Sequence, residues 1–257
     1  MALIELRGIT KEYRNDTVVT PALTGIDLTV QAGEFIAVMG ASGSGKTTLL
    51  HILGCMDRPT SGEYLYRGEH LEQAQERRLA SIRGREIAFV FQNFGLIEDY
   101  TVFENAELPL LRRRMPGARR RQEVMEALDR VGIAGLAQKR PSHLSGGQRQ
   151  RAAIARALAC GADTVLADEP TGALDSRTGQ EILELFSELN RQGKTVVLIT
   201  HDPRTAYWAK RLILIEDGRI LKDETDEKNH GSGAGQPDCG TADRLRKTQR
   251  ADAAPGV

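Results

Sequence analysis

Cysteines are few, and long apolar runs and net charge are absent, in this chain of 257 residues. The three cysteines, Cys55, Cys160 and Cys239, are widely spaced and form no metal or redox motif, which favours a reducing cytosol. No apolar run approaches the roughly 20 residues needed to cross a bilayer. The N-terminus lacks the charged and apolar regions of a signal peptide. We therefore expect any membrane role to depend on a partner.

Neither sign of charge is in excess, because Lys and Arg total 35 and Asp and Glu total 35. Net charge thus argues neither for nor against a nucleic-acid partner. The length allows one large or two small domains with a substantial core. Large apolar residues nearly vanish after about Thr225, and such a tail cannot bury enough surface to offset its ordering entropy. We predict a folded domain over residues 1–224 and a disordered tail over residues 225–257.

One stretch carries a specific chemical signature, the phosphate-binding motif G-x-x-x-x-G-K-[ST]. An apolar run at 34–39 predicts a buried strand before it, and residues 47–53 predict the start of a helix after it. The glycines allow a tight turn whose N–H groups point at one anion, and the helix adds its positive N-terminal end. Lys46 would reach the β- and γ-phosphates, and the Thr47 hydroxyl would ligate Mg²⁺. The residues expected to bind the nucleoside triphosphate are Gly40, Ala41, Ser42, Gly43, Ser44, Gly45, Lys46, Thr47 and Thr48.

Two further groups of polar residues lie at the ends of predicted elements. Leu144-Ser145-Gly146-Gly147-Gln148 precedes a helix at 149–159, and a serine with two glycines at a helix start makes a second anion site. An apolar strand at 164–168 ends in Asp168 and Glu169. Because parallel sheets bind ligands at the carboxyl ends of their strands, these two carboxylates should lie beside the phosphate loop.

The spacing of apolar residues predicts an α/β fold. Strands at 3–6 and 26–30 indicate a small antiparallel sheet ahead of the phosphate loop, and helices dominate from about 100 to 160. A polar helix is predicted at about 71–83, and the capping-box spacing of Thr101 and Glu104 predicts a helix start. The spacing of apolar residues predicts an amphipathic helix over 176–191. An Asp-Gly turn predicts a hairpin at 212–221. Tyr13 lies on the first sheet, where it either stacks on a purine base or is one more aromatic on a strand surface.

Arginines gather in two triplets, Arg112–Arg114 and Arg119–Arg121, around a Met-Pro-Gly-Ala segment. Such a cluster can meet anionic lipid headgroups. The alternative is a solvated loop face, which is the commoner reason for a charge run.

Taken together, these motifs resemble the ATP-binding subunit of an ABC transporter over about residues 1–222. The phosphate loop, Leu144–Gln148 and the pair Asp168-Glu169, twenty positions beyond it, match that family in identity and order. The resemblance implies a P-loop NTPase (RecA-like) core with an N-terminal antiparallel β subdomain and an α-helical subdomain inserted over about 93–160. It also implies ATP and Mg²⁺ as cofactors and favours adenine stacking for Tyr13.

The resemblance assigns catalytic and metal-binding roles to individual side chains. Glu169 would polarise the attacking water, while Asp168, Thr47 and in part Gln92 would hold Mg²⁺. His201, at the end of a predicted buried strand, would contact the γ-phosphate and stabilise developing charge. A Glu169 paired structurally with an arginine and an ordinary strand-end His201 stay open as alternatives.

A second copy of the chain is the first partner that the resemblance implies. The residues Ser145, Gly146, Gly147 and Gln148 of one chain would contact the γ-phosphate that Lys46 of the other holds, which makes Lys46 a catalytic residue as well. Asp175 falls at the D-loop of that family. A two-fold dimer of this kind builds two identical composite sites from one pair of surfaces.

An integral membrane permease is the second implied partner. It would dock near Gln92 and residues 94–111, against an apolar groove formed by Phe91, Phe94 and Leu96. The alternative is that these side chains fill the core of the helical region itself.

Residues 89–97 and 101–110 look like the branch of the family that serves lipoprotein export, macrolide or peptide efflux, and a related cell-division pair. The chain departs from that branch at Ile97-Glu98-Asp99-Tyr100, where a Leu-Pro turn is usual. We expect an ATPase at the cytoplasmic face of the cell membrane, bound through its permease, that drives export or extraction of a lipoprotein, peptide or hydrophobic drug. The alternative is a cell-division-type ATPase that signals across the membrane without moving cargo. A soluble ATPase of DNA repair or translation is disfavoured because Lys46 lies only 98 positions before Leu144, so we expect no nucleic-acid partner.

Overall fold

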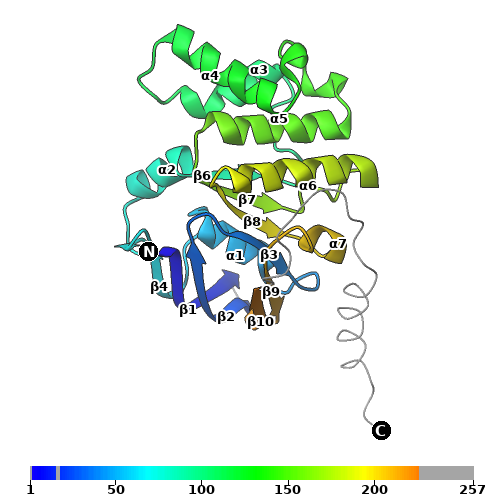
Figure 1. Ribbon diagram of the computed structural model, residues 1–257. Coiled ribbons are helices and arrows are strands. Elements are labelled where there is room, and N and C mark those ends of the chain that lie inside the picture. Colours follow the sequence, from blue (N-terminus) through cyan, green and yellow to red (C-terminus); the bar gives the residue numbers. More distant parts are fainter. Residues whose placement is uncertain (1, 16–17, 226–257) are drawn as a thin grey trace.

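The computed structural model describes residues 2–15 and 18–225 of the chain (Figure 1). Over these residues it has the predicted α/β architecture, with two sheets and helices packed against them. Thr225, predicted as the first residue of the tail, is the last residue of a strand, and residues 226–257 lie outside the described part.

The smaller sheet is antiparallel, and two of its four strands precede the phosphate loop, as predicted, while the other two follow it. Its strands in spatial order are β2 (Val18–Gln31), β1 (Ala2–Asn15), β4 (Ser61–Tyr66) and β5 (Glu69–His70). In β2 the side chains of Ile26 and Val30 are buried while Asp27 and Thr29 are exposed. One face of the sheet therefore packs on the core and the other meets solvent.

The larger sheet consists mainly of parallel strands. Their spatial order is β10 (Arg219–Thr225), β9 (Arg211–Glu216), β3 (Phe35–Met39), β8 (Thr195–Ile199), β7 (Thr164–Asp168) and β6 (Ile87–Val90). Strands β9 to β6 run parallel, and β10 returns antiparallel through Asp217 and Gly218, whose φ angles of 45° and 74° suit the predicted hairpin turn. The carboxyl ends of the parallel strands therefore meet at one edge.

The helices of the described residues are α1 (Lys46–Leu53), α2 (Glu76–Arg85), α3 (Val102–Glu107), α4 (Gly117–Arg130), α5 (Gly146–Ala159), α6 (Ser176–Arg191) and α7 (Pro203–Ala206). Within the described part, no helix combines the length and apolar character needed to cross a membrane. The capping box predicted at Thr101 and Glu104 is present at the start of α3. Helix α2 begins later than the predicted position near 71, because Leu71 and Glu72 instead hydrogen-bond to Tyr64 of β4.

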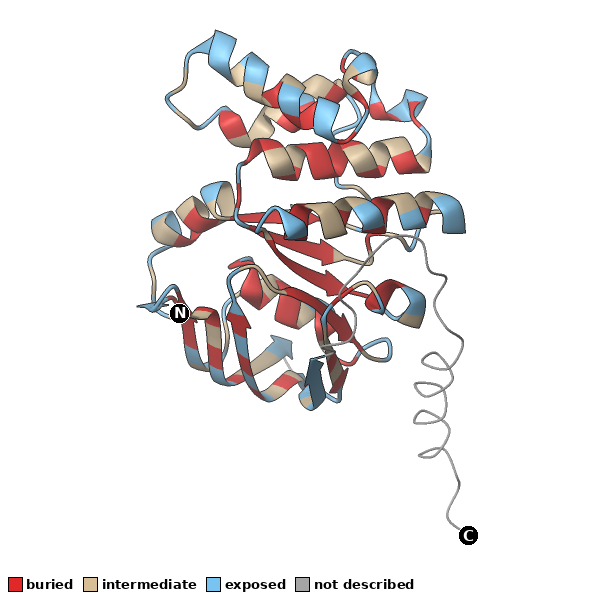
Figure 2. Cartoon of the chain, viewed as in Figure 1, coloured by how far each residue is buried: buried red, intermediate tan, exposed pale blue. Residues whose placement is uncertain are grey.

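Alternate residues of the parallel strands pack into two separate cores. Ala37 and Leu198 belong to the core shared with α3, α4, α5 and α6, whereas Ile36 and Val197 belong to the core shared with α1, α2 and the antiparallel sheet. Figure 2 shows the buried strands between these two layers. Burial of a side chain such as the fully enclosed Phe186 of α6 contributes about 1.5–3 kcal/mol. The sheet edge that carries the site is thus supported from both faces.

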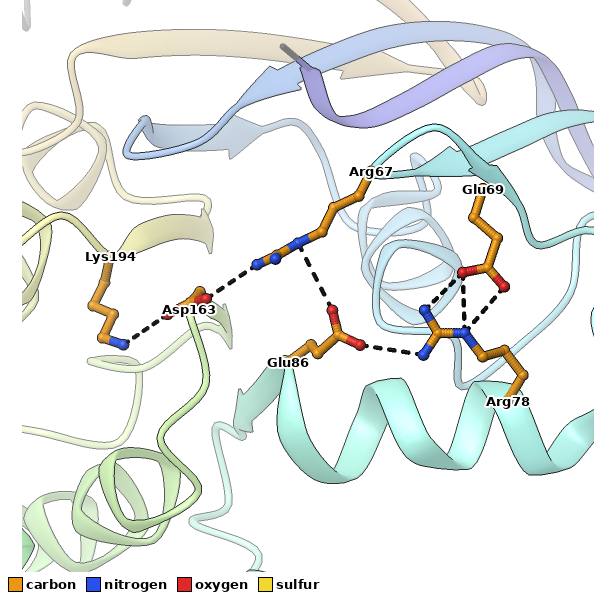
Figure 3. A network of polar contacts seen from close by, with 6 residues as sticks. All are labelled: Arg67, Glu69, Arg78, Glu86, Asp163 and Lys194. Carbon is orange, nitrogen blue, oxygen red and sulfur yellow. Dashed lines mark hydrogen bonds and ion pairs between the residues drawn. The ribbon is translucent and has the colours of Figure 1, made fainter.

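Ion pairs join the antiparallel sheet to the end at which the parallel strands begin, which lies opposite their carboxyl ends (Figure 3). Arg67, in the turn between β4 and β5, lies 3.0 Å from Asp163 and 3.7 Å from Glu86, just before β7 and β6 begin. The full network consists of Arg67, Glu69, Arg78, Glu86, Asp163 and Lys194. These charges are paired at the end of the sheet that lies away from the phosphate loop.

Candidate functional site

The phosphate loop connects β3 to α1 and depends on glycine at two crowded positions. Gly45 has a φ of 101° and is the N-cap of α1, and a Cβ there would lie 2.5 Å from the carbonyl oxygen of Ala22. A Cβ on Gly40 would lie 2.2 Å from the carbonyl oxygen of Ile215. The loop backbone therefore packs directly on neighbouring backbone, and its N–H groups start a helix with a positive end.

Lys46 lies within the curve of this loop. Its Nζ donates hydrogen bonds to the carbonyl oxygens of Gly40, at 2.9 Å, and Ala41, at 2.6 Å. Burial lowers the pKa of Lys46, while the charges of Glu169 and Asp168 act in the opposite direction. A partly desolvated ammonium group of this kind favours an anionic partner.

Asp168 and Glu169 lie beside the loop, as the parallel sheet predicts. Burial, and then the charge of Glu169, raise the pKa of Asp168, whereas His51, Lys46 and a hydrogen bond from Thr47 lower it. Glu169 has a φ of 44°, in a region that costs a residue with a Cβ about 1–2 kcal/mol and that occurs often at functional sites.

Oxygen donors at this edge suit a hard cation. The half-buried Asp168 carboxylate and the Thr47 hydroxyl lie together, and a nearby positive charge would relieve the repulsion from Glu169. No group of three or more His, Cys, Asp or Glu side chains able to hold a metal occurs among the described residues. Mg²⁺ fits this donor set when nucleotide phosphates supply further oxygens, which is its usual mode of binding.

Glu169 and His201 form a hydrogen-bonded pair. The Oε1 atom of Glu169 lies 2.7 Å from Nδ1 of His201. The Glu169 side chain is 15% exposed and that of His201 is 70% exposed. Among the described residues, Glu169 therefore hydrogen-bonds to His201 and forms no ion pair with an arginine, and the His201 side chain is the more exposed of the two.

Gln92 and Tyr13 lie at the margins of this group. A Cβ on Gly172 would lie 3.1 Å from Nε2 of Gln92 and 3.4 Å from the Glu169 carbonyl oxygen, so Gln92 borders the loop after the catalytic candidates. Tyr13 is exposed, and its hydroxyl donates to Asp57 at 3.1 Å. Its stacking on adenine stays a prediction.

The stretch Ser145–Gln148 forms the first turn of α5, three residues earlier than the predicted helix start. Ser145 and Gln148 make a reciprocal capping box, and a Cβ on Gly147 would lie 2.3 Å from Cγ2 of Thr178 in α6. Asp175 caps α6 by accepting a hydrogen bond from the Thr178 N–H at 3.0 Å. The structure therefore brings Asp175 to Ser145–Gln148. Among the described residues, no hydrogen bond or ion pair joins this second group to the phosphate loop.

The arginine triplets are not the uniform solvated face that a charge run usually indicates. Arg113 donates to the carbonyl oxygen of Cys160, and Arg120 pairs with Glu107 at 2.6 Å. A cavity of about 780 Å³ collects Arg112 and Arg113 together with arginines of α2 and α5. Sequence reasoning missed this cavity, because these segments lie far apart along the chain and no motif links them.

Comparison with known proteins gives a consistent result. The family described as ABC transporter matches residues 23–172. The chain is 47% identical over 228 residues to the uncharacterized ABC transporter ATP-binding protein YvrO of Bacillus subtilis (strain 168), covering 89% of this chain and 100% of YvrO. It is 46% identical over 232 residues to the macrolide export ATP-binding/permease protein MacB of Rhodopseudomonas palustris (strain HaA2). That match covers 90% of this chain and 36% of MacB, so the chain spans about a third of the fused relative.

A solved structure shares the fold. It is the dimeric, post-hydrolysis state of the ATP-binding cassette MJ0796 bound to ADP and Pi, with a TM-score of 0.81 and 42% identity, covering 87% of this chain and 99% of that one. Because the match covers most of this chain, it supports the architecture as well as the motifs. The chain therefore belongs to the ABC transporter family, as an ATP-binding cassette that hydrolyses ATP.

Proposed function

We propose that two copies of this chain clasp two ATP molecules, with Ser145–Gln148 of each facing the phosphate loop of the other. This proposal rests on the observation that the candidate site residues form two separate groups. Lys46 lies with Asp168 and Glu169, while Ser145–Gln148 and Asp175 form a separate group. A two-fold dimer joins the two kinds of surface without any further contact within one chain. The dimeric state of the related cassette supports the same arrangement.

In the composite site the triphosphate charge is shared by the loop N–H groups, Lys46 and the opposing start of α5. Thr47, Asp168 and in part Gln92 would hold Mg²⁺, which supplies neutralisation of the phosphate oxygens. The remaining loop residues, Gly40 to Thr48, contact the phosphates, and Tyr13 stacks on the base.

Hydrolysis uses the pair of Glu169 and His201. Glu169 accepts the proton of the attacking water, because its carboxylate lies next to Asp168 at the edge of the sheet. His201 holds Glu169 in place through the 2.7 Å contact and reaches the γ-phosphate with its exposed side. Loss of the bridging phosphate then lets the two chains separate.

A Glu169→Gln substitution tests this proposal. We expect the variant to bind ATP, to become dimeric only with nucleotide and Mg²⁺, and to lose turnover by about 10²-fold or more, because the amide cannot accept the proton. Light scattering after gel filtration and phosphate release measure the two effects. Glu188→Gln, an exposed carboxylate of α6 paired with Arg191, is the matched control. Normal hydrolysis by the Glu169 variant, or a monomer under saturating ATP, would contradict the proposal.

The partner is an integral membrane permease, and the assembly sits at the cytoplasmic face of the membrane. The fusion of a similar cassette to a permease in MacB supports this. The cargo is a lipoprotein, a peptide or a hydrophobic drug, and the macrolide export named for MacB favours transport over a signalling role without cargo.

Docking uses residues 94–111 beside Gln92. Ile97, Tyr100 and Leu111 are exposed there, at 42%, 41% and 53%, whereas Leu96 and Phe103 pack against the core. Only part of this segment therefore fills the core of the helical region, which was the alternative to docking.

Charged substitutions at the exposed members test the docking surface. Leu111→Asp and Ile97→Asp should abolish co-purification with the permease, whereas Leu221→Asp, on the exposed edge strand β10, should not. Binding that survives both substitutions would exclude the surface.

A further inference from the structure

A pocket between α2, β6, α5 and the segment after α3 is strongly basic. It has a volume of about 780 Å³, and its lining includes no acidic residue. Six arginines line it, and we call it the basic pocket: Arg77, Arg83, Arg85, Arg112, Arg113 and Arg156. Its size lies in the range of pockets that enclose several side chains or a small ligand.

The charge of these arginines is largely uncompensated by the part of the chain that the structure describes. Among the described residues, only Arg83 of the six forms an ion pair, with Glu76. Arg78, on the same helix as Arg83 but outside the pocket, contacts two carboxylates. Arg77, Arg85 and Arg112 are exposed. The basic pocket therefore offers several cations for which the described residues supply no acid.

Two of the six arginines are partly buried and, within the described ranges, hydrogen-bond only to neutral groups. Arg156 donates to the carbonyl oxygens of Phe94, at 3.1 Å, and Gly95, and burial lowers its pKa. Arg113 donates to the Cys160 carbonyl oxygen, and its buried Nε has no hydrogen-bond partner among residues 2–15 and 18–225. Desolvated cations of this kind gain most from a carboxylate that enters the pocket.

Apart from Ser81, the rest of the lining is apolar and aromatic. Phe89 and Phe91 stack with their ring centroids 5.4 Å apart, and Met56 is 47% exposed beside them. An amphipathic segment laid into a groove uses this combination, with apolar anchors and charged flanks. A planar lipid surface would reach the exposed Arg112 but not the partly buried Arg113 and Arg156, so the recessed charges favour a polypeptide.

We propose that the basic pocket receives an acidic, apolar-faced segment of the permease, whose carboxylates pair with Arg112 and Arg156. This rests on the proposed function, because it states the chemistry of the docking partner. The Phe94 and Gly95 carbonyl groups that Arg156 contacts lie two and three residues after Gln92. A segment that engages Arg156 therefore acts on the chain next to the residue that borders the Glu169 loop.

Synthetic peptides test the charge preference on the full chain. The probes are three helical peptides with the same leucine face and with Glu, Lys or Gln at every polar position, and binding is measured by fluorescence anisotropy at two salt concentrations. We expect the Glu peptide to bind at least about tenfold more tightly than the Gln peptide, and the Lys peptide to bind more weakly still. The preference should shrink with salt, because exposed charges are screened.

Substitutions locate that binding. The double variant Arg85→Glu, Arg112→Glu, at two exposed positions with no ion pair among the described residues, should lose the preference for the Glu peptide. The double variant Arg177→Glu, Arg191→Glu, an equal change of charge at two exposed positions of α6, should keep it. Equal binding of the three peptides, or an equal loss in both variants, would overturn the proposal.

Sedimentation with phosphatidylglycerol-rich vesicles gives the competing outcome. If the chain binds these vesicles through Arg112 and does not discriminate among the peptides, the surface contacts lipid and the proposal is wrong. The proposed function fails separately. A permease that co-purifies through Leu111 while no charge preference exists leaves that function intact, and a Glu169→Gln variant with normal turnover removes it without affecting the peptide result.

Discussion

Both ends of the parallel strands carry charged groups, but the two ends use them in opposite ways. At the end where the strands begin, Asp163 lies between Arg67 and Lys194, and hydrogen bonds to Lys194 and Arg67 lower the pKa of its carboxyl. At the carboxyl end, burial and Glu169 raise the pKa of Asp168. At the first end the charge of Asp163 is paired with two cations. At the second end Glu169 repels the charge of Asp168, and a cation bound together with a nucleotide would reduce that repulsion.

The comparison teaches which parts of the molecule serve stability and which serve function. A residue with a Cβ adopts a positive φ at both ends, Glu169 with 44° and Arg67 with 52°, so the electrostatics rather than the backbone distinguish the two ends. A fold can keep an unfavourable backbone or electrostatic state at a functional site, because favourable interactions elsewhere outweigh its cost in free energy. The ion pairs drawn in Figure 3 are among those favourable interactions.

The largest effect should come from Gly45→Ala, in the phosphate loop at the carboxyl end of the strands. The new Cβ would meet the Ala22 carbonyl oxygen at 2.5 Å, and the alanine would have to adopt a φ of 101°. Displacement of the loop should weaken ATP binding by about 10²-fold or more, which corresponds to about 2.7 kcal/mol. Calorimetric titration with Mg²⁺-ATP measures this. Gly117→Ala, where a Cβ meets nothing within 4 Å, should bind as the native chain does, and equal losses would show that the loop geometry is not the cause.

A smaller effect of opposite sign on stability is expected for Asp168→Asn. A raised carboxyl pKa means that the charged form destabilises the ligand-free fold, a penalty that is present above the folded pKa and is relieved as pH falls through it. Removing the charge should raise Tm without nucleotide by about 2–4 °C, while hydrolysis falls by about 10²-fold. Thermal unfolding at neutral and acidic pH checks the sign, since the gain should shrink on acidification. If the Asp168→Asn variant had a lower Tm than the native chain at neutral pH, the charge of Asp168 would not be destabilising and the contrast between the two ends would be wrong.

The smallest effect should come from Asp163→Asn, at the paired end. Because its folded pKa is lowered, Asp163 adds stability above its unfolded value of about 3.9, and this is lost as pH falls through the folded pKa. Its side chain is 61% exposed, so solvent screens the pairs and the fall in Tm should stay below about 2 °C. ATP turnover should not change. The difference in Tm from the native chain should disappear in acid, and a variant more stable than the native chain at neutral pH would refute the assignment of this end to stability.

Much of the fold followed from local pattern. Helix α6 begins at Ser176 and ends at Arg191, as the apolar spacing predicts, and the capping box at Thr101 begins α3. Helix α2 was misplaced because Leu71 and Glu72 bind to Tyr64 of β4, a contact between segments that periodicity does not reveal. The early start of α5 at Gly146 has a similar origin, since a serine and two glycines carry little helix propensity and the capping box decides.

By itself, the order of residues determined the phosphate loop, the stretch Ser145–Gln148 and the pair Asp168-Glu169, because each is a short segment whose geometry follows from its own backbone and neighbours. Only the tertiary structure decided that Glu169 pairs with His201 and that the arginines of α2 and α5 face one pocket. Those contacts join side chains from distant segments. Their positions depend on how helices pack on the sheet, and no local pattern encodes that packing.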